Sequence, residues 1–115
     1  MPNRHRGEIE ALIGGSRRRL VLTLGGLAEL EGAFGADDLV SLAERFGSGR
    51  LKAQDLTRII AAGLRGAGEA VEDQEVAQMT VADGLAGYVR IAADLIEATF
   101  GSEAPPGPQL PQAQR

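Results

Sequence analysis

Residues 8–24 read EIEALIGGSRRRLVLTL, and their alternation of apolar and other side chains predicts a β-hairpin. Two alternating runs flank Gly14-Gly15, and glycine tolerates the positive φ values of a two-residue primed turn. A loop of two residues brings the apolar positions of both runs to one face, which an odd-length loop without a bulge would not do. That face is predicted to contain Ile9, Ala11, Ile13, Leu20, Leu22 and Leu24. Because two strands alone are marginally stable, the hairpin must pack against helices or another subunit.

Downstream of the hairpin, apolar residues recur at helical spacing in segments separated mainly by glycines. In the clearest segment of the middle region, Leu56, Ile59, Ile60, Gly63 and Leu64 follow the i, i+3, i+4, i+7, i+8 pattern. The longest segment carries a continuous apolar stripe, which we assign mainly to the core. The stripe consists of Leu85, Tyr88, Val89, Ala92, Leu95, Ile96, Thr99 and Phe100. Several of the other helices are short and contain glycine, so some apolar surface remains available for a partner. The predicted helices span about 26–34, 37–46, 54–65, 72–82 and 85–100.

The predicted fold class is α+β and mostly α, with an N-terminal β-hairpin followed by four to five short helices. We expect a single domain over residues 1–101, since 115 residues fit one small domain. Residues 102–115 contain four prolines and several glutamines and offer nothing that builds a core. This C-terminal tail is therefore predicted to be disordered.

The chain has little of the inventory that catalysis or metal binding requires. It contains no cysteine, which excludes disulfides and cysteine-based zinc sites, and its one histidine is His5. The acidic pairs Asp37-Asp38 and Glu72-Asp73 stand at predicted helix starts, where negative charge favours the helix dipole. We expect no catalytic residues, no cofactor and no metal, and hence a protein that is not an enzyme.

The net charge of −4 is unevenly distributed along the chain. In residues 1–20, five arginines against two glutamates give +3, whereas the remaining residues, with seven basic and fourteen acidic side chains, give −7. An acidic body is a poor binder of nucleic acid, although the basic beginning of the chain leaves a small DNA-associated regulator as an alternative. The candidate partner-binding residues are Arg4, His5, Arg6, Arg17, Arg18 and Arg19.

The arginine run in the hairpin admits two interpretations. On a strand Arg17 and Arg19 share one face, and a turn at Gly14-Gly15 places Glu10 opposite Arg19. The favoured interpretation is a solvated edge that discourages aggregation of strands. The alternative is a docking surface for an acidic helix or protein.

The sequence disfavours two further partners, DNA and a membrane. The predicted helix at 54–65, which follows another helix, could read DNA, but antiparallel packing explains it better. A membrane partner is not expected, because the longest apolar stretch, at 20–28, is too short to span a bilayer. The first residues also lack the pattern of a signal peptide, so we expect a cytoplasmic protein.

The order of several short motifs resembles a known family. These motifs are NRHRGE at 3–8 before the hairpin, LAELE at 27–31, LAERF at 42–46, GLRGAG at 63–68, and the 92–101 segment before the proline-rich tail. Together they resemble the gene-transfer-agent family of the phage tail assembly chaperone group, over essentially the whole chain.

The resemblance implies a non-enzymatic role in assembling a phage-like tail. Tail assembly chaperones are thought to bind the long helical tape-measure protein and keep it soluble, so the implied partners are tape-measure or other tail proteins, with a homo-oligomer also possible. The same family has been labelled a tail tube protein, which leaves a structural tail component as an alternative. That label fits poorly, because tube subunits are rich in β-strands and this sequence predicts only two.

Overall fold

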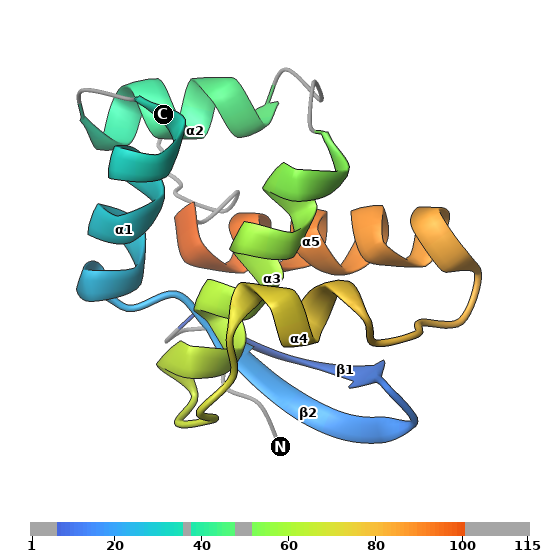
Figure 1. Cartoon of the computed structure of the whole chain (residues 1–115). Coiled ribbons are helices and arrows are strands. Elements are labelled where there is room, and N and C mark those ends of the chain that lie inside the picture. The colour runs from blue at the N-terminus through green and yellow to red at the C-terminus, as the bar shows by residue number, and fades with distance from the viewer. Residues whose placement is uncertain (1–6, 36–37, 48–51, 101–115) are drawn as a thin grey trace, which may run out of the picture.

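The computed structural model describes residues 7–35, 38–47 and 52–100, and these form a β-hairpin followed by helices (Figure 1). The predicted α+β, mostly helical fold class is confirmed. The predicted tail at 102–115 and the basic residues Arg4, His5 and Arg6 lie outside the described residues. The elements in chain order are β1 (Glu8–Ile13), β2 (Ser16–Val21), α1 (Leu24–Phe34), α2 (Leu39–Gly47), α3 (Ala53–Gly66), α4 (Asp73–Ala77) and α5 (Gly84–Phe100).

The hairpin has the turn and the register that its sequence predicts. Gly14 and Gly15 have φ values of 64° and 83°, the left-handed region that a primed two-residue turn uses. The strands are antiparallel, with Ile9 paired to Leu20 on the inner face. Ile9, Ile13, Leu20 and Leu22 are all buried, so the apolar face of the hairpin belongs to the core.

The second strand is shorter than expected and ends at Val21. Thr23 caps the next helix, because its side-chain oxygen accepts a hydrogen bond from the backbone N–H of Gly26 at 3.0 Å. Leu24, predicted to lie on the apolar face of the hairpin, is instead the first residue of α1 and is 80% exposed. Thr23 therefore starts a helix at the point where the alternation of leucines predicted that the strand continues.

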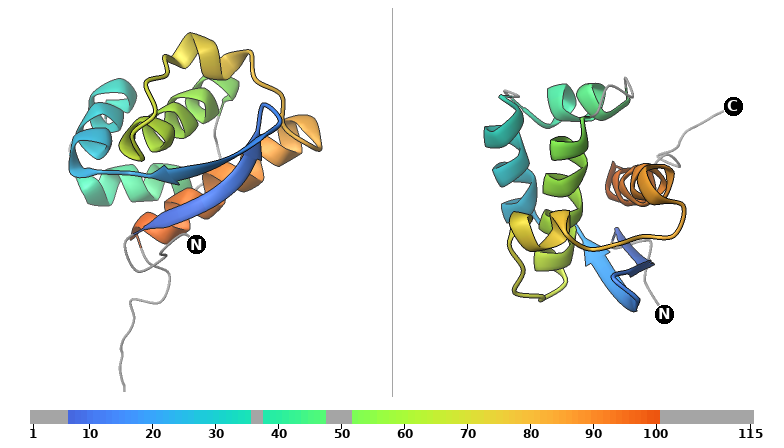
Figure 2. Two further views of the ribbon diagram at one scale, coloured as in Figure 1. Left: turned by 90° about the horizontal axis from the view of Figure 1, so that it is seen from below. Right: turned by 45° about the vertical axis from the view of Figure 1, so that its right-hand side comes forward.

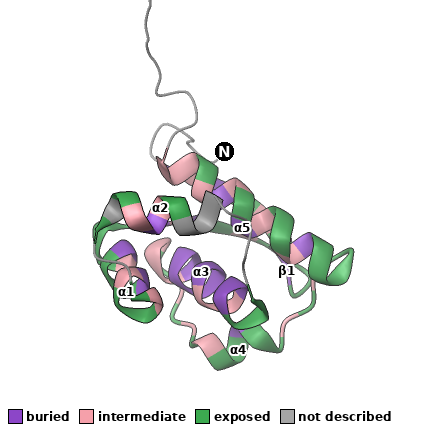
Figure 3. Cartoon of the chain, turned by 90° about the horizontal axis from the view of Figure 1, so that it is seen from above, coloured by how far each residue is buried: buried purple, intermediate pink, exposed green. Residues whose placement is uncertain are grey.

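Helix α3 lies at the centre of the molecule, in contact with β2, α1, α4 and α5 (Figure 2). Its purple colour in Figure 3 shows burial along most of its length. A β-carbon at Gly63 would lie 2.6 Å from Leu95 Cδ2 and 3.1 Å from Leu20 Cβ, so α5 and β2 meet at this glycine. The buried apolar core comprises Ile9, Ile13, Leu20, Leu22, Leu27, Leu30, Leu42, Leu56, Ile59, Ile60, Ala61, Ala62, Leu64, Val76, Ala92 and Leu95.

Helix α4 is much shorter than the helix predicted over 72–82. It begins with a capping box, in which the Glu75 carboxylate accepts a hydrogen bond from the Glu72 N–H at 2.8 Å, and it ends at Ala77. The following segment runs to α5 as a connector whose Thr80 carbonyl accepts a hydrogen bond from Gly14 N–H at 2.7 Å. This hydrogen bond holds the connector against the hairpin turn.

Polar side chains fix two other parts of the helical assembly. The Asp38 carboxylate accepts a hydrogen bond from the backbone N–H of Ser41 at 2.8 Å at the start of α2, and this bond lowers the pKa of Asp38. In the last turn of α3, Arg65 pairs with Glu29 of α1 at 2.7 Å and with Asp73 of α4 at 3.2 Å. Three helices are thus joined through one guanidinium group.

Candidate protein-binding site

The three consecutive arginines of β2 do not form one continuous basic surface. Arg17 and Arg19 lie on the outward face of the hairpin and are exposed, and Arg19 stands opposite Glu10 as predicted. Arg17 Nη1 lies 3.2 Å from Glu10 Oε1. Two of the three arginines therefore remain at the surface, and Glu10 on the neighbouring strand lies opposite Arg19 and forms an ion pair with Arg17.

Arg18 lies on the inner face, where it makes structural contacts. Its Nε donates to the Ile13 carbonyl at 2.9 Å, and its Nη1 donates to Glu69 Oε1 at 2.6 Å. The side chain is 22% exposed, so its charge is mostly covered by the segment after α3. In this arrangement Arg18 connects the hairpin turn to that segment rather than facing solvent with its neighbours.

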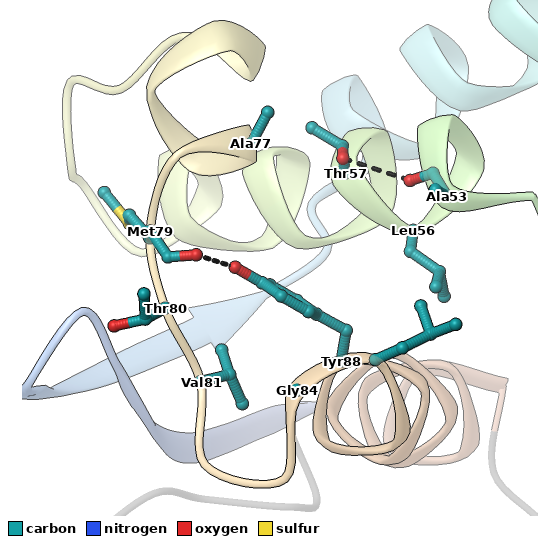
Figure 4. Close-up of a pocket in the computed structure, with 10 residues that line it drawn as sticks. Ala53, Leu56, Thr57, Ala77, Met79, Thr80, Val81, Gly84 and Tyr88 are labelled. Carbon is teal, nitrogen blue, oxygen red and sulfur yellow. Dashed lines mark hydrogen bonds between the residues drawn. The ribbon is translucent and has the colours of Figure 1, made fainter.

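An apolar groove lies beside the hairpin turn, where the start of α3, the α4–α5 connector and the start of α5 meet (Figure 4). Its volume is about 340 Å³. This volume is near the lower limit of small-ligand pockets, and it also accommodates one or two apolar side chains of a partner protein. The groove is lined by Ala53, Leu56, Thr57, Ala77, Met79, Thr80, Val81, Gly84, Leu85 and Tyr88.

The main polar groups on the groove wall are hydrogen-bonded within the protein. Figure 4 shows the Tyr88 hydroxyl of α5 donating to the carbonyl of Met79 in the connector. The Thr57 hydroxyl donates to the Ala53 carbonyl at 3.0 Å, one turn earlier in the same helix. With these groups satisfied internally, the groove presents mainly hydrocarbon to a partner.

The apolar surface continues from the groove along α5. Leu85 is 64% exposed and Val89, one turn further on, is 45% exposed. Both belong to the apolar stripe of the helix predicted at 85–100, which was expected to lie mainly in the core. For these two residues that expectation is wrong. Ala92 and Leu95 of the same stripe are buried, so the stripe is divided between a core-facing side and a solvent-facing side.

Sequence patterns alone did not locate this groove. Helical spacing identifies an apolar stripe but not how much of it a neighbouring element covers. Because α4 ends at Ala77, the connector that follows covers Tyr88 and leaves Leu85 open. The available signal was the expectation that short, glycine-containing helices leave some apolar surface for a partner.

The described residues offer little for other chemistries. Across residues 7–35, 38–47 and 52–100, no group of three or more His, Cys, Asp or Glu side chains is placed to hold a metal ion. Within those same residues, no helix is long and apolar enough to cross a membrane. Helix α3 corresponds to the segment 54–65, for which DNA reading was disfavoured. It is enclosed by β2 and three helices, α1, α4 and α5.

Comparison with known proteins gives one match. The sequence model of the family described as phage tail tube protein, GTA-gp10, matches residues 6–102, which is most of the chain and includes all of its described residues. No curated protein and no solved structure matches significantly.

Proposed function

The chain belongs to the family of phage tail tube protein, GTA-gp10, and we propose that it acts as a non-enzymatic tail assembly chaperone. Family membership supports a structural or assembly role connected with the tail of a gene transfer agent or phage. It agrees with the resemblance drawn from the short sequence motifs. The finer proposal is that the protein binds the helical tape-measure protein in the cytoplasm, before the tube forms around it.

The apolar groove beside α5 is the observation that carries this proposal. An amphipathic helix inserts apolar side chains at i, i+3, i+4 and i+7 into a groove of this kind. Leu85 lines the groove and Val89 extends its apolar surface by one helical turn, so a partner helix packing along α5 would cover both. Covering exposed apolar side chains on both partners is what keeps a long amphipathic helix soluble.

The alternative is a structural component of the tail, and the name of the family, phage tail tube protein, favours it. The fold supports it less well, because the described residues contain one two-stranded sheet and are otherwise mostly helical. A tube built by joining β-sheets needs more strands from each subunit. Mass spectrometry of purified particles distinguishes the two roles, since a tube subunit is present in many copies and a chaperone is absent or scarce.

The proposal is tested by expressing the tape-measure protein of the same gene cluster with and without this chain. We expect a soluble complex with the native chain and insoluble tape measure with a Leu85→Ser, Val89→Ser variant. Leu24→Ser is the matched control, because Leu24 is even more exposed but does not line the groove. A tape measure equally soluble alone, or a complex that survives the groove variant, contradicts the proposal.

A further inference from the structure

We infer that Gly87 of α5 is the positioning residue of the apolar groove. Because it has no β-carbon, the connector between α4 and α5 (residues 78–83) lies directly against α5 and forms one wall of the groove. The inference rests on the proposed function for the partner that fills the groove. It goes beyond that function by naming the residue that sets the separation of the groove walls.

Gly87 is buried but does not itself line the groove. It lies in the first turn of α5, next to Tyr88, which does line it. Within a helix, glycine is less favourable than alanine, so a buried helical glycine is explained where a neighbour occupies the space of a β-carbon. At Gly87 that neighbour is the connector.

The connector approaches Gly87 through its backbone. A β-carbon at Gly87 would lie 2.1 Å from the Ala82 carbonyl oxygen and 2.7 Å from Val81 Cγ1. Ordinary van der Waals contacts of a β-carbon measure 3.4–4 Å, so a methyl group here would push the Ala82 carbonyl away by about 1 Å or more. Since that oxygen belongs to the main chain, no change of side-chain rotamer relieves the clash.

The segment that a methyl group would displace is the wall of the groove. Met79, Thr80 and Val81 of the connector all line it, together with residues of α3 and α5. Figure 4 shows the connector running from Met79 past Val81 to Gly84, where α5 begins. A shift of the Ala82 carbonyl therefore moves the neighbouring Val81 side chain, and the groove changes shape.

Two hydrogen bonds attach the connector at its other end. The Thr80 carbonyl accepts a hydrogen bond from Gly14 N–H at 2.7 Å, and the Met79 carbonyl accepts one from the Tyr88 hydroxyl. Both bonds hold the part of the connector that is further from α5 along the chain. The contact with Gly87 therefore fixes the part that leads directly into α5.

The turn from the connector into α5 has little freedom to absorb a shift. Asp83 and Gly84 have φ values of 69° and 56°, both in the left-handed region. For a residue other than glycine this conformation costs energy, and it persists where the surrounding structure holds it. A methyl group at position 87 would thus displace the connector rather than be accommodated by the turn.

Gly66 of α3 provides a matched control. A β-carbon there would lie 2.0 Å from the Val21 carbonyl oxygen, which is a main-chain clash like the one at Gly87. Neither Gly66 nor Val21 lines the groove. Gly66→Ala and Gly87→Ala therefore both strain the fold, but only Gly87→Ala displaces a wall of the groove.

The first test uses the full chain and needs no partner. Hydrogen exchange of the Gly14 amide, which donates to Thr80, reports whether the connector is in place, and amides at the centre of α3 report global stability in the same sample. In Gly87→Ala we expect the Gly14 amide to exchange about tenfold faster, relative to the α3 amides, than in the native chain. In Gly66→Ala this ratio should keep its native value.

The second test measures how much tape-measure protein of the same gene cluster stays soluble on co-expression, relative to the amount of soluble chain. We expect Gly87→Ala to retain about tenfold less than the native chain, and Gly66→Ala to stay within about twofold of it. If the native chain itself retains none, the proposed function fails, and the exchange ratio alone decides the role of Gly87.

Two results would overturn the inference: native exchange at Gly14 in a folded Gly87→Ala variant, or equal losses of soluble tape measure for Gly66→Ala and Gly87→Ala. If Gly87→Ala does not fold, NMR spectra of the native chain decide. A nuclear Overhauser effect between Gly87 Hα and the Val81 methyl protons supports the close contact, and its absence would contradict it.

Discussion

The last turn of α3 touches the second strand backbone to backbone, because Gly66 lies directly against the carbonyl group of Val21. A methyl group at position 66 would overlap the Val21 oxygen, and that oxygen belongs to a strand rather than to a movable side chain. The glycine is therefore required for its small size. It sets how closely the central helix approaches the hairpin.

We predict that Gly66→Ala destabilises the protein by about 3 kcal/mol, because the helix or the strand must shift to make room. In an exposed helix the same substitution stabilises, since alanine has the higher helix propensity. Gly32 of α1 is the matched control, as nothing lies within 4 Å of a β-carbon placed there. Gly32→Ala should raise stability by about 0.5–1 kcal/mol in urea denaturation. Equal effects of the two substitutions would refute the close contact.

The hairpin was predictable because its determinants are local. Gly14-Gly15 fixes the turn, the turn fixes the register, and the register decides that Glu10 stands opposite Arg19. The burial of the centre of α3 was predictable for a similar reason, because its apolar residues are closely spaced within one segment. In both cases the information lies within one segment of sequence.

The groove was not predictable because it results from how segments end and meet. Val76 is the only fully buried residue of α4, so its apolar pattern could not mark where the helix stops. The contact of the connector with Gly14 joins residues far apart in the sequence. The exposure of Arg17 and the partial burial of Arg18 likewise depend on which segments pack against the inner face of the hairpin.

The two neighbouring arginines should differ in their effect on stability. Arg18→Gln removes the ion pair with Glu69 and the bond to the Ile13 carbonyl, both partly shielded from solvent, and should cost about 1–2 kcal/mol. Arg17→Gln breaks an exposed pair with Glu10 and should change stability by less than about 0.5 kcal/mol. Chemical denaturation of both variants measures the difference. A larger effect at Arg17 would contradict the inward placement of Arg18.

Acid should weaken the start of α2 through Asp38. The hydrogen bond from Ser41 N–H holds the pKa of Asp38 below its usual value in the folded protein. A group with a lowered folded pKa stabilises the fold at pH values above its unfolded pKa, and that contribution is lost as the pH falls through the folded pKa. The stability difference between the native chain and Asp38→Ala should therefore be full above about pH 5 and shrink towards pH 2.

Asp38→Asn is the control for this titration, because asparagine also caps helices but carries no titrating carboxylate. Its stability relative to Asp38→Ala should stay nearly constant over the same range of pH. Denaturation curves recorded at intervals between about pH 2 and pH 6 provide both comparisons. A constant difference between the native chain and Asp38→Ala would show that the carboxylate charge is not involved.

The hydroxyl group of Tyr88 should contribute to stability but not to partner binding. Its hydrogen bond to the Met79 carbonyl fixes the connector against α5, so Tyr88→Phe should cost about 1 kcal/mol and leave the ring in place. Because the hydroxyl is used internally, the affinity for the tape-measure protein should remain within about twofold of the native value. Tyr88→Ala, which removes the wall of the groove, should weaken that affinity more than tenfold, on the order of an interface hot spot. Calorimetric titration of the three proteins separates these outcomes, and a large loss of affinity for Tyr88→Phe would mean that the hydroxyl faces the partner instead.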